Sequence, residues 1–470
     1  MCSEQDYMRT MNQTMRFSRV NAVGSVTTTP IWQKTISRSA FALALGCAAF
    51  APLRCAAAKT NWVYKVDLAV KEAYDSNVYL QDTAPTNTAP GAFPAKKDSW
   101  ITTLTPRLAV TYTVGDGFNA GMSYAPDLVF YHNAHTEDHF AHRFGLTFNG
   151  KAERILWEQA NAFTYIDGDS LGPLFARPQD VPAVGGIPLR ERRDALVYRG
   201  SLKVAYSVGK FFIRPVGSAY IHDFRTQQKL ANEVPAPYIY VNFNDRQDVN
   251  GGLDFGYKLT DTTSVLVGYR YGRQDQFRGP SVFDPTRFAD SPYDSEYHRI
   301  LLGAEGTPVP WLRLAVLAGP DIRNWRNATP SGFNRDEVLY WIDATVTVLP
   351  TKADTIVLLN RRYEQPAFTS QSVYEDITYS VTWRHKFNDR LTGSAAFQLY
   401  IGDWQAPVQR EDWIYTPSVS LTYVYDKHIT AELSYSYDWV ENKVPTSIAP
   451  YAEGREFTRH IVGLSLKYNF

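Results

Sequence analysis

The sequence predicts an all-β fold, a transmembrane antiparallel β-barrel of about 18 strands in a bacterial outer membrane. Long stretches alternate apolar and polar residues, and short turns alternate with long polar connections. Aromatic residues make up 14% of the chain although its mean hydropathy is only −0.31. A barrel combines these properties because only alternate residues meet lipid and aromatic residues gather at the two membrane interfaces. No stretch approaches 18 consecutive apolar residues, which excludes a helical membrane protein.

The stretch from Thr458 to Phe470 alternates without a break and ends on an aromatic residue. One face carries His460, Val462, Leu464, Leu466, Tyr468 and Phe470, and the other carries Arg459, Ile461, Gly463, Ser465, Lys467 and Asn469. This pattern is typical of the closing strand of an outer-membrane barrel. Residues 100–112, 373–384 and 429–439 alternate in the same way, with one row predicted to face lipid and the other to face the lumen.

Turn signals and long polar connections set the strand count. Eight short turns are expected at 115–117, 149–150, 208–210, 260–262, 308–310, 350–354, 388–389 and 426–427. Nine longer loops are expected at 75–98, 132–138, 167–193, 225–245, 275–294, 324–335, 365–372, 403–411 and 441–455. Together they join 18 strands and return both termini to the short-turn side. Residues 155–166 and 356–361 carry apolar residues on both faces, so 16 or 20 strands also fit. A propeller would show repeats of nearly constant length, which the chain lacks.

The chain divides into an N-terminal extension with a signal peptide, residues 1–58, and one β-barrel, residues 59–470. Lys34 and Arg38 precede an apolar run at 39–53, and cleavage is expected near Ala58. The apolar run begins late, so either the basic region is long or the start is a later methionine such as Met15.

The three cysteines, Cys2, Cys47 and Cys55, all precede the expected cleavage site, which leaves no disulfide chemistry in the mature chain. A lipoprotein is the alternative, but Arg54 directly before Cys55 argues against it.

Charged residues recur in the rows predicted to face the lumen. Lys and Arg balance Asp and Glu at 48 each, so nothing indicates a nucleic-acid partner. The predicted lumen-lining residues are Arg107, Arg143, Arg199, Arg214, Arg270, Arg299, Asp343, Asp376, Arg384, Glu432 and Arg459. An excess of arginine favours anions or acidic sugars. We favour the simpler interpretation for most of these charges, in which they pair across neighbouring strands and fill the barrel.

A group of four histidines, His132, His135, His139 and His142, lies where the third strand passes into the fourth. Imidazole is a common metal ligand, but His139 and His142 fall on opposite faces of a strand, so the group is only a weak metal candidate. No cofactor is expected. An enzyme that acts on lipid would need a lipid-facing Ser near a lipid-facing His such as His460. We identify no such serine in the sequence, so we do not expect the chain to be an enzyme.

Two segments near the start of the barrel carry a family resemblance. They are Tyr74-Asp75-Ser76-Asn77-Val78-Tyr79 and the run from Lys97 to Pro106, in which Asp98 and Trp100 precede a Thr-rich stretch. These motifs resemble the putative beta-barrel porins often associated with exopolysaccharide and capsule loci. The residues that carry the match are Tyr74, Asp75, Asn77, Asp98, Trp100 and Pro106, for which we expect structural roles.

The resemblance implies an outer-membrane barrel that serves as a conduit or accessory for polysaccharide, with outer-membrane lipid as its surroundings. The closing strand and Phe470 look like the signal read by the barrel-assembly machinery. Three functions remain open: a channel for polysaccharide or a small polar solute, a plugged structural or adhesive barrel acting through loops such as 167–193 and 275–294, and a lipid-modifying enzyme.

Overall fold

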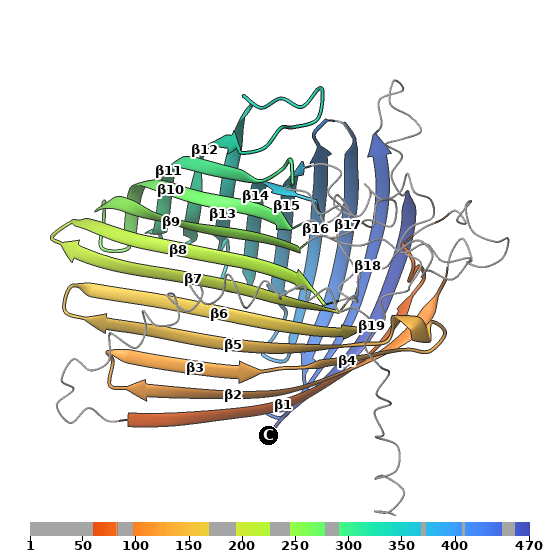
Figure 1. The fold of residues 1–470 in the computed structure, drawn as a ribbon. Coiled ribbons are helices and arrows are strands. Elements are labelled where there is room, and N and C mark those ends of the chain that lie inside the picture. The colour runs from red at the N-terminus through yellow and green to blue at the C-terminus, as the bar shows by residue number, and fades with distance from the viewer. Residues whose placement is uncertain are drawn as a thin grey trace, which may run out of the picture. The chain divides into compact units, whose positions relative to one another are not determined.

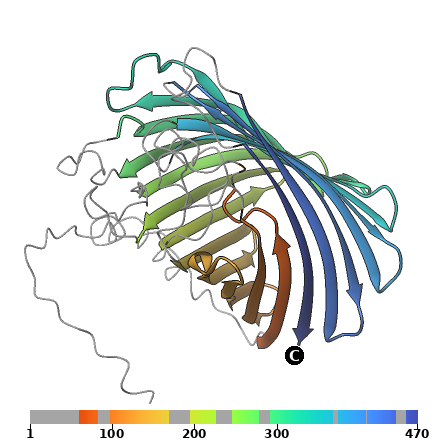
Figure 2. The same cartoon turned by 90° about the vertical axis from the view of Figure 1, so that its right-hand side faces the viewer.

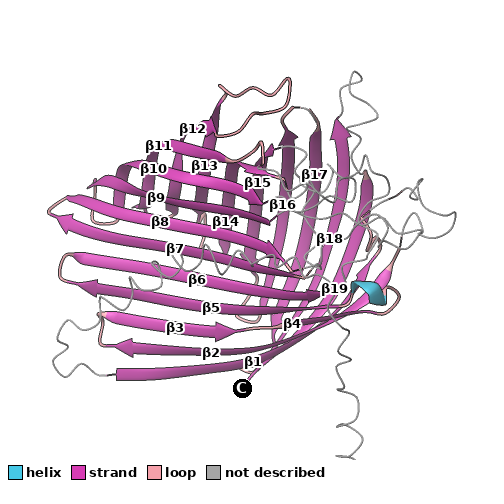
Figure 3. Cartoon of the chain, in the orientation of Figure 1, coloured by secondary structure: helices cyan, strands magenta, loops and turns pink. Residues whose placement is uncertain are grey.

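The computed structural model describes residues 60–80, 82, 97–168, 194–225, 245–277, 291–367, 373–406, 409–443 and 456–470. The expected signal peptide and most of the long loops lie outside these residues. The described chain is almost entirely β-strand, with one short 3-10 helix, η3 (His135–Glu137) (Figure 3). No helix among the described residues is both long enough and apolar enough to cross a membrane.

The strands form one antiparallel sheet in which neighbours in sequence are neighbours in space (Figure 1). They are β1 (Thr60–Asp75), β2 (Ser99–Val114), β3 (Phe118–Tyr124), β4 (Asp127–Tyr131), β5 (His139–Ala152), β6 (Ile155–Gly168), β7 (Ala195–Val208), β8 (Phe211–Phe224), β9 (Asp245–Lys258), β10 (Thr263–Phe277), β11 (Ser295–Val309), β12 (Leu312–Trp325), β13 (Val338–Val348), β14 (Asp354–Pro366), β15 (Val373–Lys386), β16 (Leu391–Trp404), β17 (Glu411–Val424), β18 (Ile429–Lys443) and β19 (Phe457–Asn469).

β3 and β4 are two halves of one barrel strand. Both pair with β2 on one side and with β5 on the other. The interruption falls at Ala125-Pro126, where proline has no N–H to give to the ladder. Counted this way the barrel has 18 strands, and the predicted fold class and strand number are confirmed.

The barrel closes through β1 and β19, which pair from Asp67 opposite Asn469 to Asp75 opposite Ile461. The two strands lie side by side near the C-terminus in Figure 2. Closure matters because a free strand edge would leave unpaired N–H and C=O groups in lipid, at a cost of several kcal/mol for each group.

The two faces of the sheet differ as the alternation predicts. On β19, Leu464 and Leu466 point outward and are 53% and 52% exposed. Lys467, one position further, reaches Asp67 of β1 inside the barrel at 3.3 Å. The outward faces near the two ends of the strands carry exposed aromatic side chains, which suit the two membrane interfaces. Those toward the short turns include Trp62, Phe211, Trp311 and Phe387, and those toward the long loops include Trp100, Tyr165, Tyr271 and Trp439.

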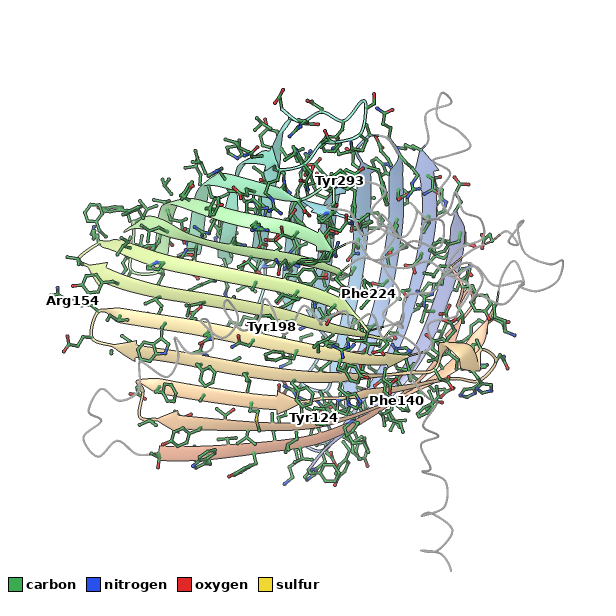
Figure 4. The ribbon with its side chains drawn as sticks, viewed as in Figure 1. Tyr124, Phe140, Arg154, Tyr198, Phe224 and Tyr293 are labelled. Atoms are coloured by element: carbon green, nitrogen blue, oxygen red, sulfur yellow. The ribbon has the colours of Figure 1, made fainter. Side chains whose placement is uncertain are left out.

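Seven of the eight predicted short turns lie within a residue or two of connections in the structure, but the turn predicted at Asn149-Gly150 is wrong. β5 continues to Ala152, and the turn is Glu153-Arg154, with Glu153 at a positive φ of 49°. Arg154 lies at this end of the barrel in Figure 4, opposite Phe224 and Tyr293 at the long-loop end. Gly150 is needed because the ring of Trp157 on β6 occupies the space that a Cβ would take, 1.9 Å away.

Local hydrogen bonds rather than packing stabilise the short turns. The carboxylate of Asp426 accepts the backbone N–H groups of His428 and Ile429, at 2.7 and 2.8 Å. These two bonds, that of Ile429 first, lower the pKa of Asp426 because they favour its ionised form. The Asp426 turn joins β17 to β18 where the sequence predicts it.

Candidate functional site

The inner wall of the barrel contains a cavity of about 1000 Å³ lined by β6 to β16. Seven of its lining residues are Arg or Lys and five are Asp or Glu. The cations are Arg199, Lys203, Arg214, Arg246, Arg270, Arg299 and Arg361, and the acids are Asp248, Asp254, Glu305, Asp343 and Asp376. The cavity therefore carries a formal excess of positive charge.

The long-loop end of β14 bends into the lumen and crosses toward β10, on the side of the barrel formed by β9 to β14. β14 pairs with β13 only as far as Arg362 but with β15 as far as Pro366, and its last residues approach β10, although three strands lie between β10 and β14 in the sheet. The crossing segment is residues 363–367. It is the inward fold that narrows the barrel.

Donors from β9, β10 and β12 hold the backbone of the crossing segment. Arg246 donates to the carbonyl of Pro366 at 2.8 Å, and Arg323 donates to that of Glu364 at 3.0 Å. Gln274 also donates to Glu364 O at 3.1 Å, and Gln276 donates to the carbonyl of Ala367. Residues 363–366 still pair with β15 but no longer with β13, and these side chains donate hydrogen bonds to carbonyls that β13 no longer reaches.

Two ion-pair networks support the wall beside the cavity. In the first, Asp254 is shared by Arg214 at 2.9 Å and Arg270 at 2.6 Å, and Arg214 also binds Glu305 at 2.9 Å. Asp254 is fully buried, so its charge depends on both guanidinium groups.

The second network lies nearer the long loops. Asp321 binds Arg299 at 2.9 Å and Arg323 at 3.1 Å, and Arg323 continues to the carboxylate of Glu364 at 3.2 Å. The side chains of Asp321 and Arg323 are each 1% exposed. This network ties the wall to the crossing segment.

The third feature of the cavity is a tyrosine ring between two arginines. The guanidinium of Arg199 lies 5.1 Å from the ring centre of Tyr220, and that of Arg246 lies 5.4 Å from it. The Tyr220 hydroxyl bonds Nδ1 of His222 at 3.0 Å. Arg199 is exposed to the lumen and has no carboxylate within ion-pair distance among the residues that the structure describes. It is therefore available to a solute.

The predicted lumen-lining residues fall into two groups. Arg143, Arg214, Arg270, Arg299 and Arg459 have carboxylate partners, and Asp343 lies 3.5 Å from Arg361. These charges fill the barrel, in line with the simpler of the two interpretations.

Arg107, Arg199 and Arg384 are exposed and make no ion pair within the described ranges. Asp376 accepts a bond from Gln365 at 2.9 Å, and Glu432 accepts a longer one from Thr422 at 3.3 Å. That any of them contacts a solute stays a prediction.

Sequence reasoning missed the residues that hold the crossing segment, chiefly Arg246, Gln274, Gln276 and Arg323. Arg323 follows Asp321 in the alternating inward row of β12, so the charge pattern could have placed it in the lumen. Nothing in the sequence indicated that residues 363–367 turn inward, because these contacts join strands far apart in the chain.

The four grouped histidines have separate surroundings. His132 bonds Thr102 at 2.9 Å, His135 lies 3.6 Å from Asp138, and His142 bonds the hydroxyl of Tyr124 at 2.8 Å. His139 bonds the carbonyl of Glu137 at 2.9 Å. Within the described part of the chain, no group of three or more His, Cys, Asp or Glu side chains is placed to hold a metal ion.

The residues that carry the family resemblance make side-chain contacts where the first and last strands pair and close the barrel. Asp75 makes a bidentate ion pair with Arg459 of β19, at 3.0 and 2.6 Å, and also accepts the backbone N–H of Asn77 at 2.9 Å. The side chain of Asn77 donates to the carbonyl of Thr458 at 2.9 Å.

On the outer face of the same strands, the ring of Tyr74 lies 5.5 Å from that of Trp100, and its hydroxyl donates to Asp98 at 3.2 Å. The motif thus has a structural role at the β1–β2 and β1–β19 junctions.

A closed barrel with an apolar outer face, aromatic bands at both ends and a polar, charged lumen defines a porin-like β-barrel of the bacterial outer membrane. The model of the family Putative beta-barrel porin 2 matches residues 326–470. The match supports the family resemblance found in the sequence over residues 326–470, whereas the motifs at 74–106 that carry the resemblance lie outside this range.

Several solved structures resemble the chain as a whole. The anion-selective porin from Comamonas acidovorans is 9% identical, with a TM-score of 0.36 and coverage of 88% of this chain and 100% of that one. The outer membrane protein opdK from Pseudomonas aeruginosa is 11% identical, with a TM-score of 0.40 and coverage of 87% and 99%. A BenF-like porin from Pseudomonas fluorescens Pf-5 is 9% identical, with a TM-score of 0.41 and the same coverage. No curated protein sequence matches the chain.

Proposed function

We propose that the barrel conducts small polar solutes and favours anions. The observation that carries this proposal is Arg199, an exposed cation without a carboxylate partner in the described chain, on a cavity wall with seven cationic and five acidic residues. Fixed charge of one sign in a narrow passage raises the local concentration of the opposite ion. A solute anion would supply the partner that Arg199 lacks.

The crossing segment sets the size limit in this proposal. Residues 363–367 would reduce the open section of the lumen beside the cavity, and their backbone is bound to β9 by Arg246 and to β12 by Arg323. Solutes would have to pass beside this segment, where the wall is cationic. Size and sign of charge would then be selected at the same level of the barrel.

Liposome swelling tests this proposal with solutes of equal size and different charge. Liposomes containing the barrel should swell faster in an anionic sugar acid than in the matching neutral sugar, and faster in the neutral sugar than in the amino sugar. Equal rates for the three solutes would contradict the preference for anions. Swelling no faster than that of empty liposomes would contradict an open passage.

We further propose that acidic saccharides are the relevant solutes, which would agree with the link to exopolysaccharide expected from the family resemblance. The cavity offers tyrosine rings as well as cations, namely Tyr220, Tyr363, Tyr374 and Tyr400. Aromatic rings pack against the apolar faces of sugars while guanidinium groups bind carboxylates. In a planar bilayer, an acidic oligosaccharide should block the current and a neutral one of equal length should not; equal block by both would remove the saccharide proposal.

A closed structural or surface barrel is the second candidate, and the crossing segment favours it. Its backbone is anchored by Arg246, Gln274, Gln276 and Arg323, so the segment is held in place inside the lumen. The loops that would then carry the function, 167–193 and 275–294, lie largely outside the described residues. A folded barrel that passes no current would favour this candidate.

We also propose that β19 is the strand which the barrel-assembly machinery reads. Its outward row ends in Tyr468 and Phe470, whose rings lie 4.8 Å apart, and Phe470 is 74% exposed. The variant Phe470→Ala should then reach the outer membrane in smaller amounts, as measured by cell fractionation. Unchanged amounts would contradict this role.

A further inference from the structure

Three histidines on the outer face share one position in the barrel. His142, His298 and His460 are each the fourth residue of a strand that begins at the long-loop end, namely β5, β11 and β19. We call these three the loop-end histidines. They belong to strands distributed around the barrel, and none lies in the polar lumen.

Each loop-end histidine has the same pair of neighbours. A tyrosine directly opposite in the register packs against the imidazole, and a second tyrosine, one step diagonally toward the short turns, bonds its Nδ1 atom. Both tyrosines lie on the preceding strand for His298 and His460, whereas for His142 the opposite tyrosine is on β6 and the diagonal one on β3. The Nδ1–Oη distances are 2.8 Å for His142 and Tyr124, 2.7 Å for His298 and Tyr269, and 3.0 Å for His460 and Tyr435. The ring distances to the opposite tyrosine are 6.0 Å for His142 and Tyr165, 5.3 Å for His298 and Tyr271, and 4.7 Å for His460 and Tyr437.

The repeated bond to Nδ1 fixes what the other nitrogen can do. When the tyrosine hydroxyl donates to Nδ1, a neutral imidazole carries its proton on Nε2. His298 and His460 are exposed, so this N–H points toward the lipid headgroup region rather than toward protein. We assign this tautomer to all three imidazoles, which then present three ordered donors on the outer face.

At the short-turn end of the barrel, the histidines use Nδ1 as a donor instead of an acceptor. The Nδ1 atom of His385 faces the carboxylate of Asp354 at 2.8 Å, and that of His428 faces the carbonyl of Asn469 at 2.7 Å. These partners are acceptors, so here Nδ1 carries the proton and donates within the protein. The outward-facing donor is thus a feature of the loop end, which faces the cell exterior in outer-membrane barrels.

We propose that the loop-end histidines bind phosphate groups of the glycolipid in the outer leaflet of the membrane. The occupant must be a lipid of that leaflet, because the donors lie on the lipid-facing surface at the level of its headgroups. A phosphate oxygen is the strongest acceptor there, since hydrogen bonds to a charged acceptor are about twice as strong as neutral ones. The flanking tyrosines orient the imidazoles and present aromatic rings to the sugar. The proposal concerns the outer wall and is independent of what passes through the lumen.

The test compares two sets of histidine substitutions in the refolded full barrel. The triple variant His142→Phe, His298→Phe, His460→Phe keeps aromatic rings at the loop end and removes the three donors. The double variant His385→Phe, His428→Phe makes the same change at the short-turn end. Native mass spectrometry measures how much of a diphosphorylated glucosamine-disaccharide lipid, or of the same lipid without phosphate, stays on each protein.

Wild type and the double variant should retain the phosphorylated lipid equally, and the triple variant should bind it about tenfold more weakly at each site. Equal retention by the triple variant, or equal retention of the lipid without phosphate, would overturn the proposal. A change in the number of protein copies with no change in lipid would overturn it too, because the histidines would then lie in a contact between barrels. The single variant His298→Phe, with one site lost of three, gives the same answer if the triple variant does not refold.

Discussion

Replacing Arg199 by Gln should weaken the preference for anions without altering the barrel. The guanidinium is exposed to the lumen, makes no ion pair within the described chain, and packs only on the ring of Tyr220 at 5.1 Å. A cavity of about 1000 Å³ has the volume of a sphere roughly 6 Å in radius, so a solute ion lies about that far from the wall.

At that distance the attraction between one guanidinium charge and a monovalent anion is about 0.7 kcal/mol in a water-like dielectric and about 2.8 kcal/mol at an effective dielectric of about 20. Screening at roughly 0.15 M salt, where the Debye length is about 8 Å, halves both figures. The anion concentration in the cavity should therefore fall by about twofold to tenfold.

Reversal potentials in planar bilayers under a salt gradient measure this change. Lys443→Gln is the matched control, because it removes one positive charge from a side chain that packs over Trp413, 3.6 Å from its ring centre, at the end of β18. The control should leave the reversal potential unchanged while Arg199→Gln shifts it toward cations. An unchanged potential in Arg199→Gln, or the same shift in both variants, would refute the assignment of Arg199 to the selective wall.

Three further predictions concern the wall and the closure of the barrel. The double variant Gln274→Ala, Gln276→Ala removes two donors to the crossing segment and should raise single-channel conductance, because residues 363–367 lose part of their anchorage. Gly150→Ala should lower the free energy of unfolding in urea by about 1–3 kcal/mol, since a Cβ there overlaps an aromatic ring. Asp75→Asn should lower it by about 3–5 kcal/mol, because it leaves a mostly buried arginine without its main partner.

Gly150→Ala has a matched control, and each of the other two variants has an outcome that would contradict its prediction. Gly217→Ala adds a Cβ whose nearest neighbour is at an ordinary 3.5 Å, so it should unfold like the wild type; equal loss in both glycine variants would argue against the ring overlap. Conductance that stays at the wild-type level in the glutamine variant would show that the crossing segment does not limit flow. An Asp75→Asn barrel as stable as the wild type would remove the ion pair from the account of closure.

The sequence predicted the barrel well because the alternation of residues is a local property. The row 429–439 faces lipid and lumen as expected, and so does the row 373–384 from Tyr379 onward, whereas Val373 and Ile377 are buried at 1% and 8% exposed instead of facing lipid. All nine long connections lie within a few residues of their predicted positions. The turn at Asn149-Gly150 failed because the same dipeptide that suits a turn also suits a strand whose neighbour needs room for Trp157.

The candidate site was predictable only in part. Alternation placed Arg199, Arg214 and Arg270 on the inner wall, but the pairing of two of them with Asp254 and the freedom of the third depend on register between strands. The crossing segment at 363–367 could not be predicted, because the side chains that hold it come from β9, β10 and β12. Contacts between distant strands leave no periodic trace in the sequence.

The conductance of the purified, refolded wild-type barrel in a planar bilayer tests the central claim most directly. The account predicts stable current steps with a reversal potential on the anion side, reduced by an acidic oligosaccharide. Circular dichroism and heat-modifiable migration would first show that the protein is a folded barrel. The absence of any current through such a protein would contradict an open, anion-selective passage.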